Sequence, residues 1–174
     1  MRSQSYWKAI VAGVAAFIAL LPNLAAATPA KDIQVVARLL TFLENGPTGR
    51  TVIGIVFDSD KPESVAEKNA IMAALGSGYS AGKVTLVGKP MRADAVGGAK
   101  VLFITQGVNF AAVGAEAKAN NILTIGSAPI CVRSGACVVG VATDPTVQIV
   151  VNRRAAVAAG ATFKSAFRMM IHEF

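Results

Sequence analysis

The spacing of apolar and polar positions changes several times along this chain. Residues 31–45 carry apolar side chains every three or four positions, among them Ile33 and Val36, with polar side chains between them. This spacing predicts an amphipathic helix that packs on a core. Residues 51–57 form a nearly continuous apolar run of strand length, which is typical of a strand covered on both faces.

The middle of the chain alternates between strand patterns and helix patterns. Asp60 is placed to cap a helix that runs to Leu75, and Glu63 is placed to return a hydrogen bond to it. An alanine-rich stretch at residues 108–120 has apolar positions at helical spacing. Short apolar runs predict strands at residues 83–87, 100–104 and 122–125. This repeated order of strand and helix argues for parallel pairing with right-handed crossovers.

The C-terminal third predicts a different kind of pairing. Two β-branched runs at residues 137–141 and 147–151 are separated by turn-forming residues, as in two antiparallel strands. Asn152 suits the start of a short helix and Gly160 suits its end, and residues 163–171 resemble a terminal packing helix. The whole pattern predicts a single, three-layer-like α/β domain with a mostly parallel sheet, an antiparallel C-terminal hairpin and flanking helices.

The N-terminal segment predicts export. Residues 1–8 carry two cations, residues 9–21 are uninterruptedly apolar, and residues 25–27 are three alanines. These features indicate a signal peptide at residues 1–27, and the mature domain then covers residues 28–174 and resides in the periplasm. A membrane anchor is the alternative, but 13 apolar residues rise only about 20 Å as a helix, short of the hydrocarbon core of about 30 Å. No stable anchor is therefore expected after cleavage.

The charge of the chain limits the partners to consider. The formal net charge of +7 falls to +5 once Arg2 and Lys8 are removed with the signal peptide. The cations are scattered, with only Arg153 and Arg154 adjacent, and no aromatic surface is interleaved with them. Nucleic acid is therefore not the expected partner. Attraction to an acidic partner or to anionic lipid head groups fits the charge better.

Two cysteines, Cys131 and Cys137, are the only ones in the sequence. An even count in an exported chain predicts a disulfide bond between them. Closing so short a loop would stabilise the fold by roughly 2 to 2.5 kcal/mol in the chain-entropy treatment. The alternative is a redox sensor in which reduction alters partner binding. The C-x-x-C spacing of thioredoxin-like exchange chemistry is absent.

Several polar residues follow the predicted strands directly. In a mostly parallel sheet, ligands bind beyond the carboxyl ends of the strands. The residues expected to form the rim of a small-ligand crevice there are Asp58, Ser59, Thr105, Gln106 and Ser127. The alternative is that they are ordinary solvated loop residues. The glycines of the chain form neither a G-x-G-x-x-G pattern nor a phosphate-binding loop.

No catalytic constellation is apparent. His172 is the single histidine, so it cannot build a multi-histidine metal site, and the context of Ser165 is no nucleophile elbow. Asp58 and Asp60 are better explained by a turn and a helix cap. We therefore expect a protein that is not an enzyme and that needs neither a metal nor another cofactor.

The C-terminal block also carries a family resemblance. A cysteine-bearing, glycine-rich segment is followed by the hairpin and then by N-R-R-A-A-V-A-A-G-A-T-F-K-S at residues 152–165. In this order of segments, the chain resembles the YfiR-like family of bacterial periplasmic proteins. The last third matches motif by motif, and the mature chain matches in length and element order. The family's N-terminal segment with a Glu-Trp-Pro-like triplet corresponds to residues 42–47, where no tryptophan follows.

The resemblance implies a regulatory protein. Such a protein binds the periplasmic sensory domain of an inner-membrane signalling protein, typically a diguanylate cyclase, and represses it. The resemblance also implies the Cys131–Cys137 disulfide and a homodimer. Val35, Leu39 and Phe42 form a second apolar line on the first helix that is a candidate partner or dimer surface. The alternative function is a periplasmic small-molecule-binding lobe that serves a transporter or receptor.

Overall fold

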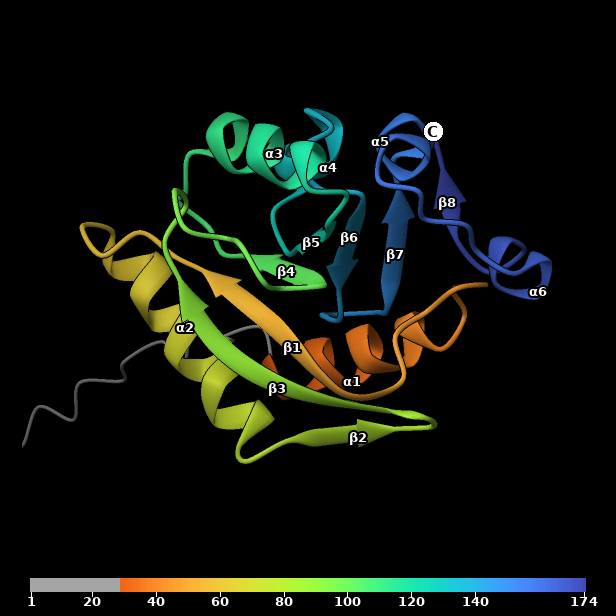
Figure 1. Ribbon diagram of the computed structural model, residues 1–174, viewed down its shortest axis with the longest axis horizontal. Coiled ribbons are helices and arrows are strands. Elements are labelled where there is room, and N and C mark those ends of the chain that lie inside the picture. The colour runs from red at the N-terminus through yellow and green to blue at the C-terminus, as the bar shows by residue number, and fades with distance from the viewer. Residues whose placement is uncertain (1–28) are drawn as a thin grey trace, which may run out of the picture.

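The fold is seen in a computed structural model that describes residues 29–174. The signal peptide predicted at residues 1–27 lies outside the described residues. In chain order the elements are α1 (Pro29–Leu40), β1 (Gly49–Val56), α2 (Pro62–Leu75), β2 (Tyr79–Ala81), β3 (Val84–Met91), β4 (Val101–Ile104), α3 (Phe110–Ala119), β5 (Leu123–Gly126), α4 (Pro129–Arg133), β6 (Val139–Ala142), β7 (Gln148–Val151), α5 (Arg153–Ala158), α6 (Ser165–Arg168) and β8 (His172–Glu173) (Figure 1).

Within this part of the chain, eight strands form one sheet in the order β2-β3-β1-β4-β5-β6-β7-β8. The five central strands, which lie in the order β3-β1-β4-β5-β6, are all parallel to one another. At one end β2 pairs antiparallel with β3, and at the other end β7 pairs antiparallel with β6 and parallel with β8. The predicted α/β domain with a mostly parallel sheet, a C-terminal hairpin and flanking helices is confirmed.

Alternate residues of the central strands enter two cores on opposite faces of the sheet. On β4, Val101 and Phe103 belong to the core that also holds apolar residues of α1 and α2. Leu102 and Ile104 belong to the core that holds residues of α3 and α4. Because successive strand residues point to opposite faces, an uninterrupted apolar run is what a strand covered on both faces requires.

Three helix boundaries differ from the sequence prediction. The first helix ends at Leu40 rather than at Asn45, and the chain continues in turns. The helix predicted at residues 163–171 is reduced to the short α6, because residues 169–171 form a turn and a bend before β8 begins at His172. The predicted capping box of α2 is wrong, because Lys61 occupies the capping position and makes no side-chain cap. Pro62 is the first residue of that helix. A backbone N–H at this position would have no hydrogen-bond acceptor within the helix, so proline, which lacks one, is well tolerated there.

Other local predictions are confirmed. The side chain of Asn152 accepts a hydrogen bond from the Ala155 amide at the start of α5. Gly160 has a φ of +63° just beyond this helix, a conformation that glycine adopts without steric cost. The sequence patterns missed β2 and α4, because elements of three and five residues are too short to show a period.

Three phenylalanines join the end of α1 to the C-terminal segment. The ring centroid of Phe167 lies 5.0 Å from that of Phe42 and 5.3 Å from that of Phe163. Leu39 is only 1% exposed, and Val35 and Phe42 pack partly buried against the same core. Leu39 therefore cannot belong to the partner or dimer surface predicted on the first helix, and Phe42 lies beyond the end of α1. A partner role for Val35 and Phe42 stays a prediction.

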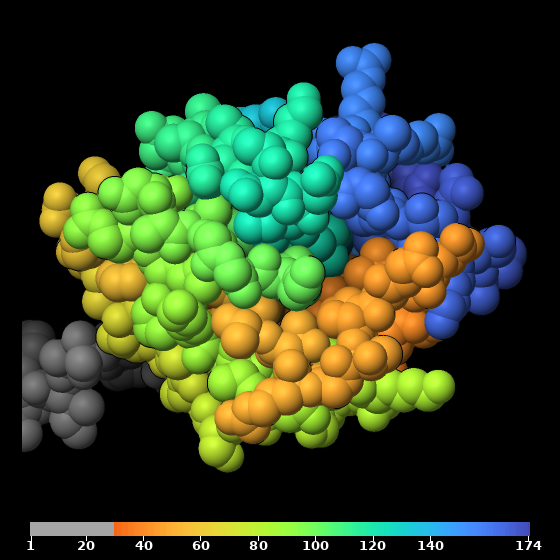
Figure 2. Space-filling view, viewed as in Figure 1, coloured from red at the N-terminus to blue at the C-terminus, as the bar shows by residue number. Residues whose placement is uncertain are grey.

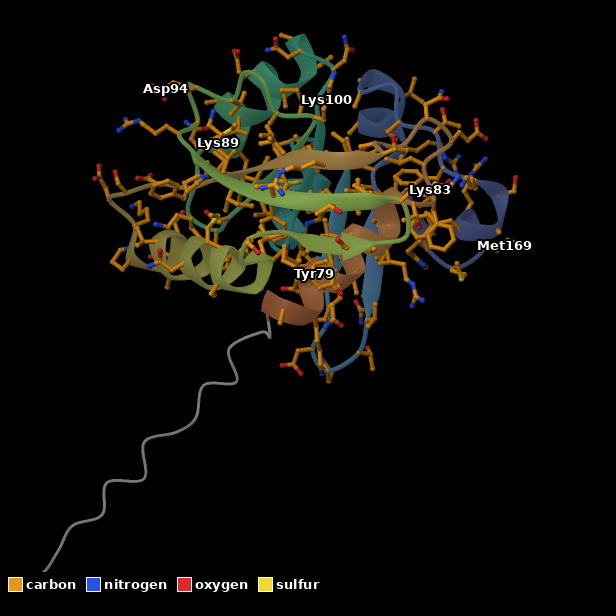
Figure 3. All side chains as sticks on the ribbon, turned by 60° about the horizontal axis from the view of Figure 1, so that its bottom comes forward. Tyr79, Lys83, Lys89, Asp94, Lys100 and Met169 are labelled. Atoms are coloured by element: carbon orange, nitrogen blue, oxygen red, sulfur yellow. A yellow bond between two sulfur atoms is a disulfide. The ribbon has the colours of Figure 1, made fainter. Side chains whose placement is uncertain are left out.

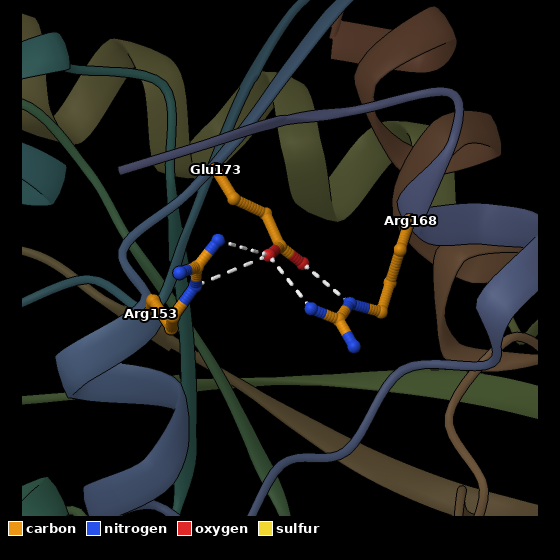
Figure 4. A network of polar contacts seen from close by, with 3 residues as sticks. All are labelled: Arg153, Arg168 and Glu173. Atoms are coloured by element: carbon orange, nitrogen blue, oxygen red, sulfur yellow. Dashed lines mark hydrogen bonds and ion pairs between the residues drawn. The ribbon is translucent and has the colours of Figure 1, made fainter.

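A polar network holds the C-terminal strand. The Glu173 carboxylate accepts hydrogen bonds from the guanidinium groups of Arg153 and Arg168, at 3.1 to 3.3 Å (Figure 4). Hydrogen bonding by Arg168, and then by Arg153, lowers the pKa of the Glu173 carboxyl below its ordinary value. Arg153 and Arg168 thus share a carboxylate partner in Glu173.

Candidate functional site

The order of the parallel strands creates a switch point in the sheet. The chain passes from β1 to β3 on one side of it and then crosses back to β4 on the other side. The loops that follow β1 and β4 therefore leave the sheet in opposite directions. In open α/β sheets a crevice forms at such a point, outside the carboxyl ends of the strands.

A hollow of about 370 Å³ lies at this switch point. It is lined by the segments that follow β1, β3 and β4, namely residues 57–60, 92–94 and 108–109. The hollow includes Asp58 and Ser59, which the sequence placed at a crevice rim. The structure thus brings together polar residues as far apart in the chain as Asp58 and Asn109.

The hollow offers both signs of charge and an aromatic wall. Arg92 Nε lies 3.5 Å from Asp94 Oδ1, and both side chains are largely exposed. Asp58 Oδ1 accepts a hydrogen bond of 2.9 Å from the Asp60 amide, which fixes the loop after β1. Phe57 is half-buried, and Lys68 Nζ lies 4.6 Å from the centroid of its ring, a cation–π contact that holds the ring in place.

Thr105 does not lie on the rim, contrary to the sequence prediction. It is fully buried, and its hydroxyl donates to the Val56 carbonyl at 2.9 Å. The same oxygen lies 2.6 Å from Ser64 Oγ. Because the Thr105 proton is already used, Ser64 is the donor in this pair. These bonds join α2 to the ends of β1 and β4, so Thr105 supports the crevice from below.

Glu67 of α2 connects the other two predicted rim residues. Its Oε2 accepts from the Gln106 amide at 2.8 Å, and its Oε1 accepts from the Ser127 hydroxyl. Burial raises the pKa of the Glu67 carboxyl above its ordinary value, the two hydrogen bonds oppose this, and the charge of Asp32 adds to it. The sequence analysis did not single out Glu67, because a glutamate inside a helix carries no local signal of this contact.

Replacing Glu67 by glutamine is expected to weaken the dependence of stability on pH. Since the folded-state pKa lies above the unfolded one, the folded protein binds more protons between the two values. The free energy of unfolding therefore falls as the pH rises through that window. Glutamine cannot ionise, so this contribution disappears. Urea unfolding at pH values from about 4 to 7 would measure the slope.

The matched control for this experiment is Glu63→Gln. Glu63 is exposed on the first turn of the same helix, so its replacement should leave the slope unchanged. Equal slopes in the wild type and in Glu67→Gln would contradict the role given to burial of the Glu67 carboxylate.

A second hollow of about 590 Å³ lies beside Ser127, between α4 and the strands β6 and β7. Its lining is mainly apolar, with Val132, Val150 and the terminal Phe174 among its residues, and Arg133 supplies a cation. Gly140 lies in its lining, where a Cβ atom would lie 2.6 Å from Val132 Cγ2. A glycine is therefore needed for the close approach of α4 to β6.

The disulfide predicted between Cys131 and Cys137 is present and joins α4 to the segment before β6. The two Cα atoms are 5.1 Å apart, and both cysteines are fully buried. The Cys137 amide also donates to the Cys131 carbonyl at 3.0 Å, so the loop is closed twice. A redox-sensing role for this bond stays a prediction.

No group of three or more histidine, cysteine or acidic side chains in residues 29–174 is placed to hold a metal ion. His172 is exposed on β8. None of the helices in this part of the chain has both the length and the apolar character that crossing a membrane requires.

Comparison with known proteins shows a fold and no family. No family model matches the sequence, and no curated protein matches it either. Membership of the YfiR-like family, and the regulatory function that it implies, stay predictions from the sequence.

Solved structures do match. One is a conserved domain protein from Vibrio cholerae O1 biovar El Tor, with a TM-score of 0.63 and 12% identity over 84% of this chain and 60% of that one. Another is an ABC domain in complex with L-Trp from Streptococcus pneumoniae, with a TM-score of 0.61 and 13% identity over the same shares. Both proteins share the fold of the present chain.

A third match is the ligand-free, open structure of a substrate-binding protein with adhesive properties from Clostridium difficile. Its TM-score is 0.59, with 14% identity over 83% of this chain and 58% of that one. The present chain thus spans about 60% of the length of the three structures.

Proposed function

We propose that this chain is an extracytoplasmic small-molecule-binding lobe whose ligand site is the hollow at the switch point. The observation that carries the proposal is that the hollow is built from the ends of β1, β3 and β4 together. A site assembled from several strand ends of a rigid sheet holds its polar groups in fixed relative positions. The predicted export and the buried disulfide agree with an extracytoplasmic location.

The lining of the hollow suits a small zwitterion of amino-acid type. The Arg92 guanidinium provides a fork of donors for a carboxylate, and Asp58 and Asp94 provide acceptors for an ammonium group. The ring of Phe57 provides contact for an apolar side chain. Arg92 and Asp94 are paired only at the surface, where an ion pair contributes little, so a ligand can replace that pair at small cost.

Two of the structural matches support this function. One is described with bound L-Trp and another as a substrate-binding protein. Because the chain spans about 60% of those structures, a second lobe, a partner or a second copy would close the site over the ligand. Delivery of the ligand to a transporter or receptor completes the proposal.

The proposal is tested by screening amino acids, with L-Trp among them, for an increase in melting temperature and measuring the hits by calorimetry. A ligand present at 100 times its Kd stabilises the folded state by about 2.7 kcal/mol. Arg92→Gln is expected to weaken binding about tenfold, since it removes a charge-assisted hydrogen bond worth about 1.5 kcal/mol or more.

The control variant is Arg154→Gln. Arg154 is exposed on α5, which follows β7 and therefore lies at the opposite edge of the sheet. Its replacement should leave the affinity unchanged. If no amino acid raises the melting temperature, or if both variants bind equally well, the proposed site is wrong.

A further inference from the structure

Two hollows lie side by side at the opposite edge of the sheet, where the parallel strands begin. One of about 790 Å³ reaches from the end of α1 to the hairpin of β2 and β3. The other, of about 660 Å³, reaches from the start of β1 to the starts of β4 and β5. Both are lined by Leu43, Pro47 and Thr48, so we treat them as one amino-end groove. Figure 2 shows the orange segment that contains residues 43–52 beside the green segment near residue 100 and the blue C-terminal segment.

The charged side chains of the amino-end groove are almost all basic. The cations that line it are Arg38, Arg50, Lys83, Lys100 and Lys164, and the one acidic residue is Glu44. The ion pairs of residues 29–174 involve Arg92, Arg153 and Arg168 instead. The five groove cations thus lack a carboxylate within 4 Å in this part of the chain, and their field is open to a ligand.

The sheet order concentrates these cations. Arg50, Lys83 and Lys100 lie at or just before the first residues of β1, β3 and β4, which are adjacent parallel strands. Asp58 and Asp94 follow the other ends of the same strands. Figure 3 shows Lys83 and Lys89 at opposite ends of β3, with Asp94 beyond Lys89. The groove cations and these two aspartates therefore lie at opposite edges of the sheet.

The amino-end groove also offers apolar surface between its cations. Val52 is 36% exposed and Leu43 is partly buried, and both line the groove. Tyr79 of β2 adds an aromatic side chain to the hollow that Lys83 also lines. A ligand that fills the groove therefore needs anionic groups together with apolar ones.

We propose that the amino-end groove binds an acidic peptide segment of a partner protein. A groove fits an extended chain better than the flat surface of a membrane, and carboxylates spaced along a peptide can reach cations from three neighbouring strands. A single aromatic side chain offers no stacking platform for nucleic-acid bases. The groove and the switch-point hollow lie at opposite edges of the sheet, so this proposal does not depend on the ligand site.

The test measures the fluorescence anisotropy of a fluorescein-labelled ten-residue peptide of glutamate and leucine in the presence of the purified chain. Binding is expected at low salt and should weaken as salt rises, because screening acts on exposed charges. The triple variant Arg50→Gln, Lys83→Gln and Lys100→Gln should weaken binding at least tenfold. The single variant Lys100→Gln should weaken it by a smaller factor, and it provides a second measurement with minimal change to the fold.

The matched control removes the same net charge elsewhere. Lys31, Lys61 and Lys89 are exposed and lie toward the carboxyl ends of the strands, so their replacement by glutamine should change the affinity less than twofold. Equal losses in the two triple variants would show attraction to net charge alone and overturn the proposal. Absence of peptide binding would also overturn it. So would binding of the chain to phosphatidylglycerol vesicles if an excess of the peptide failed to compete with the vesicles.

Discussion

Replacing Phe167 by alanine is expected to lower the free energy of unfolding by about 3 kcal/mol, the lower part of the range for a buried phenylalanine. Phe167 is buried, and its ring contacts those of Phe42 and Phe163. The substitution removes both contacts and leaves a cavity between α1 and the C-terminal segment. Urea unfolding followed by circular dichroism would measure the change.

Phe174→Ala is the control for this experiment. Phe174 is 52% exposed at the end of the chain, so its loss should cost less than about 1 kcal/mol. A change below 1 kcal/mol for Phe167→Ala would mean that the C-terminal segment contributes little to the core.

The aromatic cluster matters for the amino-end groove as well as for stability. Two backbone hydrogen bonds of 2.9 Å run beside it, from the Lys164 amide to the Phe42 carbonyl and from the Glu44 amide to the Thr162 carbonyl. They fix residues 42–44 against the C-terminal segment, and Lys164 Nζ donates to the Thr41 carbonyl at 3.0 Å. The groove wall is therefore held by contacts between the two ends of the described chain.

Replacing both cysteines by alanine is expected to lower the free energy of unfolding by about 2 kcal/mol. The disulfide restricts the conformational entropy of the unfolded chain by closing a short loop. Removing it restores that entropy, which corresponds to about 2 kcal/mol in the chain-entropy model. Alanine at both Cys131 and Cys137 leaves no buried thiol or hydroxyl to complicate the comparison. Unfolding under oxidising conditions would measure the difference.

Reduction supplies an independent check on the disulfide. Wild type unfolded in the presence of dithiothreitol should approach the stability of the double variant, and the variant itself should not respond to dithiothreitol. If the wild type and the double variant unfold at the same urea concentration under oxidising conditions, the bond contributes nothing to the fold. Unchanged peptide and amino-acid binding by the variant would make the bond structural rather than regulatory.

Local patterns predicted most elements because they act over a few residues. The alternation of strand and helix and the antiparallel hairpin follow from side-chain periodicity and turn chemistry, and both appear in the structure. The cap at Asn152 was predictable for the same reason. At Asp60 the same kind of reasoning failed, since Pro62 begins α2 two residues later and the capping position falls on Lys61.

The candidate ligand site was only half predictable. A residue that follows a strand is expected at the edge of the sheet, and Asp58 and Ser59 do line the switch-point hollow there. Whether such a residue faces solvent depends on what packs over it. Ser64 of α2 is hydrogen-bonded to Thr105, and Glu67 of the same helix accepts a hydrogen bond from the Ser127 hydroxyl. Neither contact has a signature in the sequence.

The sequence by itself determined the α/β class, the parallel core with its terminal hairpin and the pairing of the only two cysteines, because periodicity and a count of two leave few alternatives. The tertiary structure alone decided that Leu39 is buried, that Glu67 joins two strand ends and that scattered cations gather at one edge of the sheet. Those features depend on the order of the strands, which brings residues far apart in the chain to one edge, and local side-chain patterns do not encode that order.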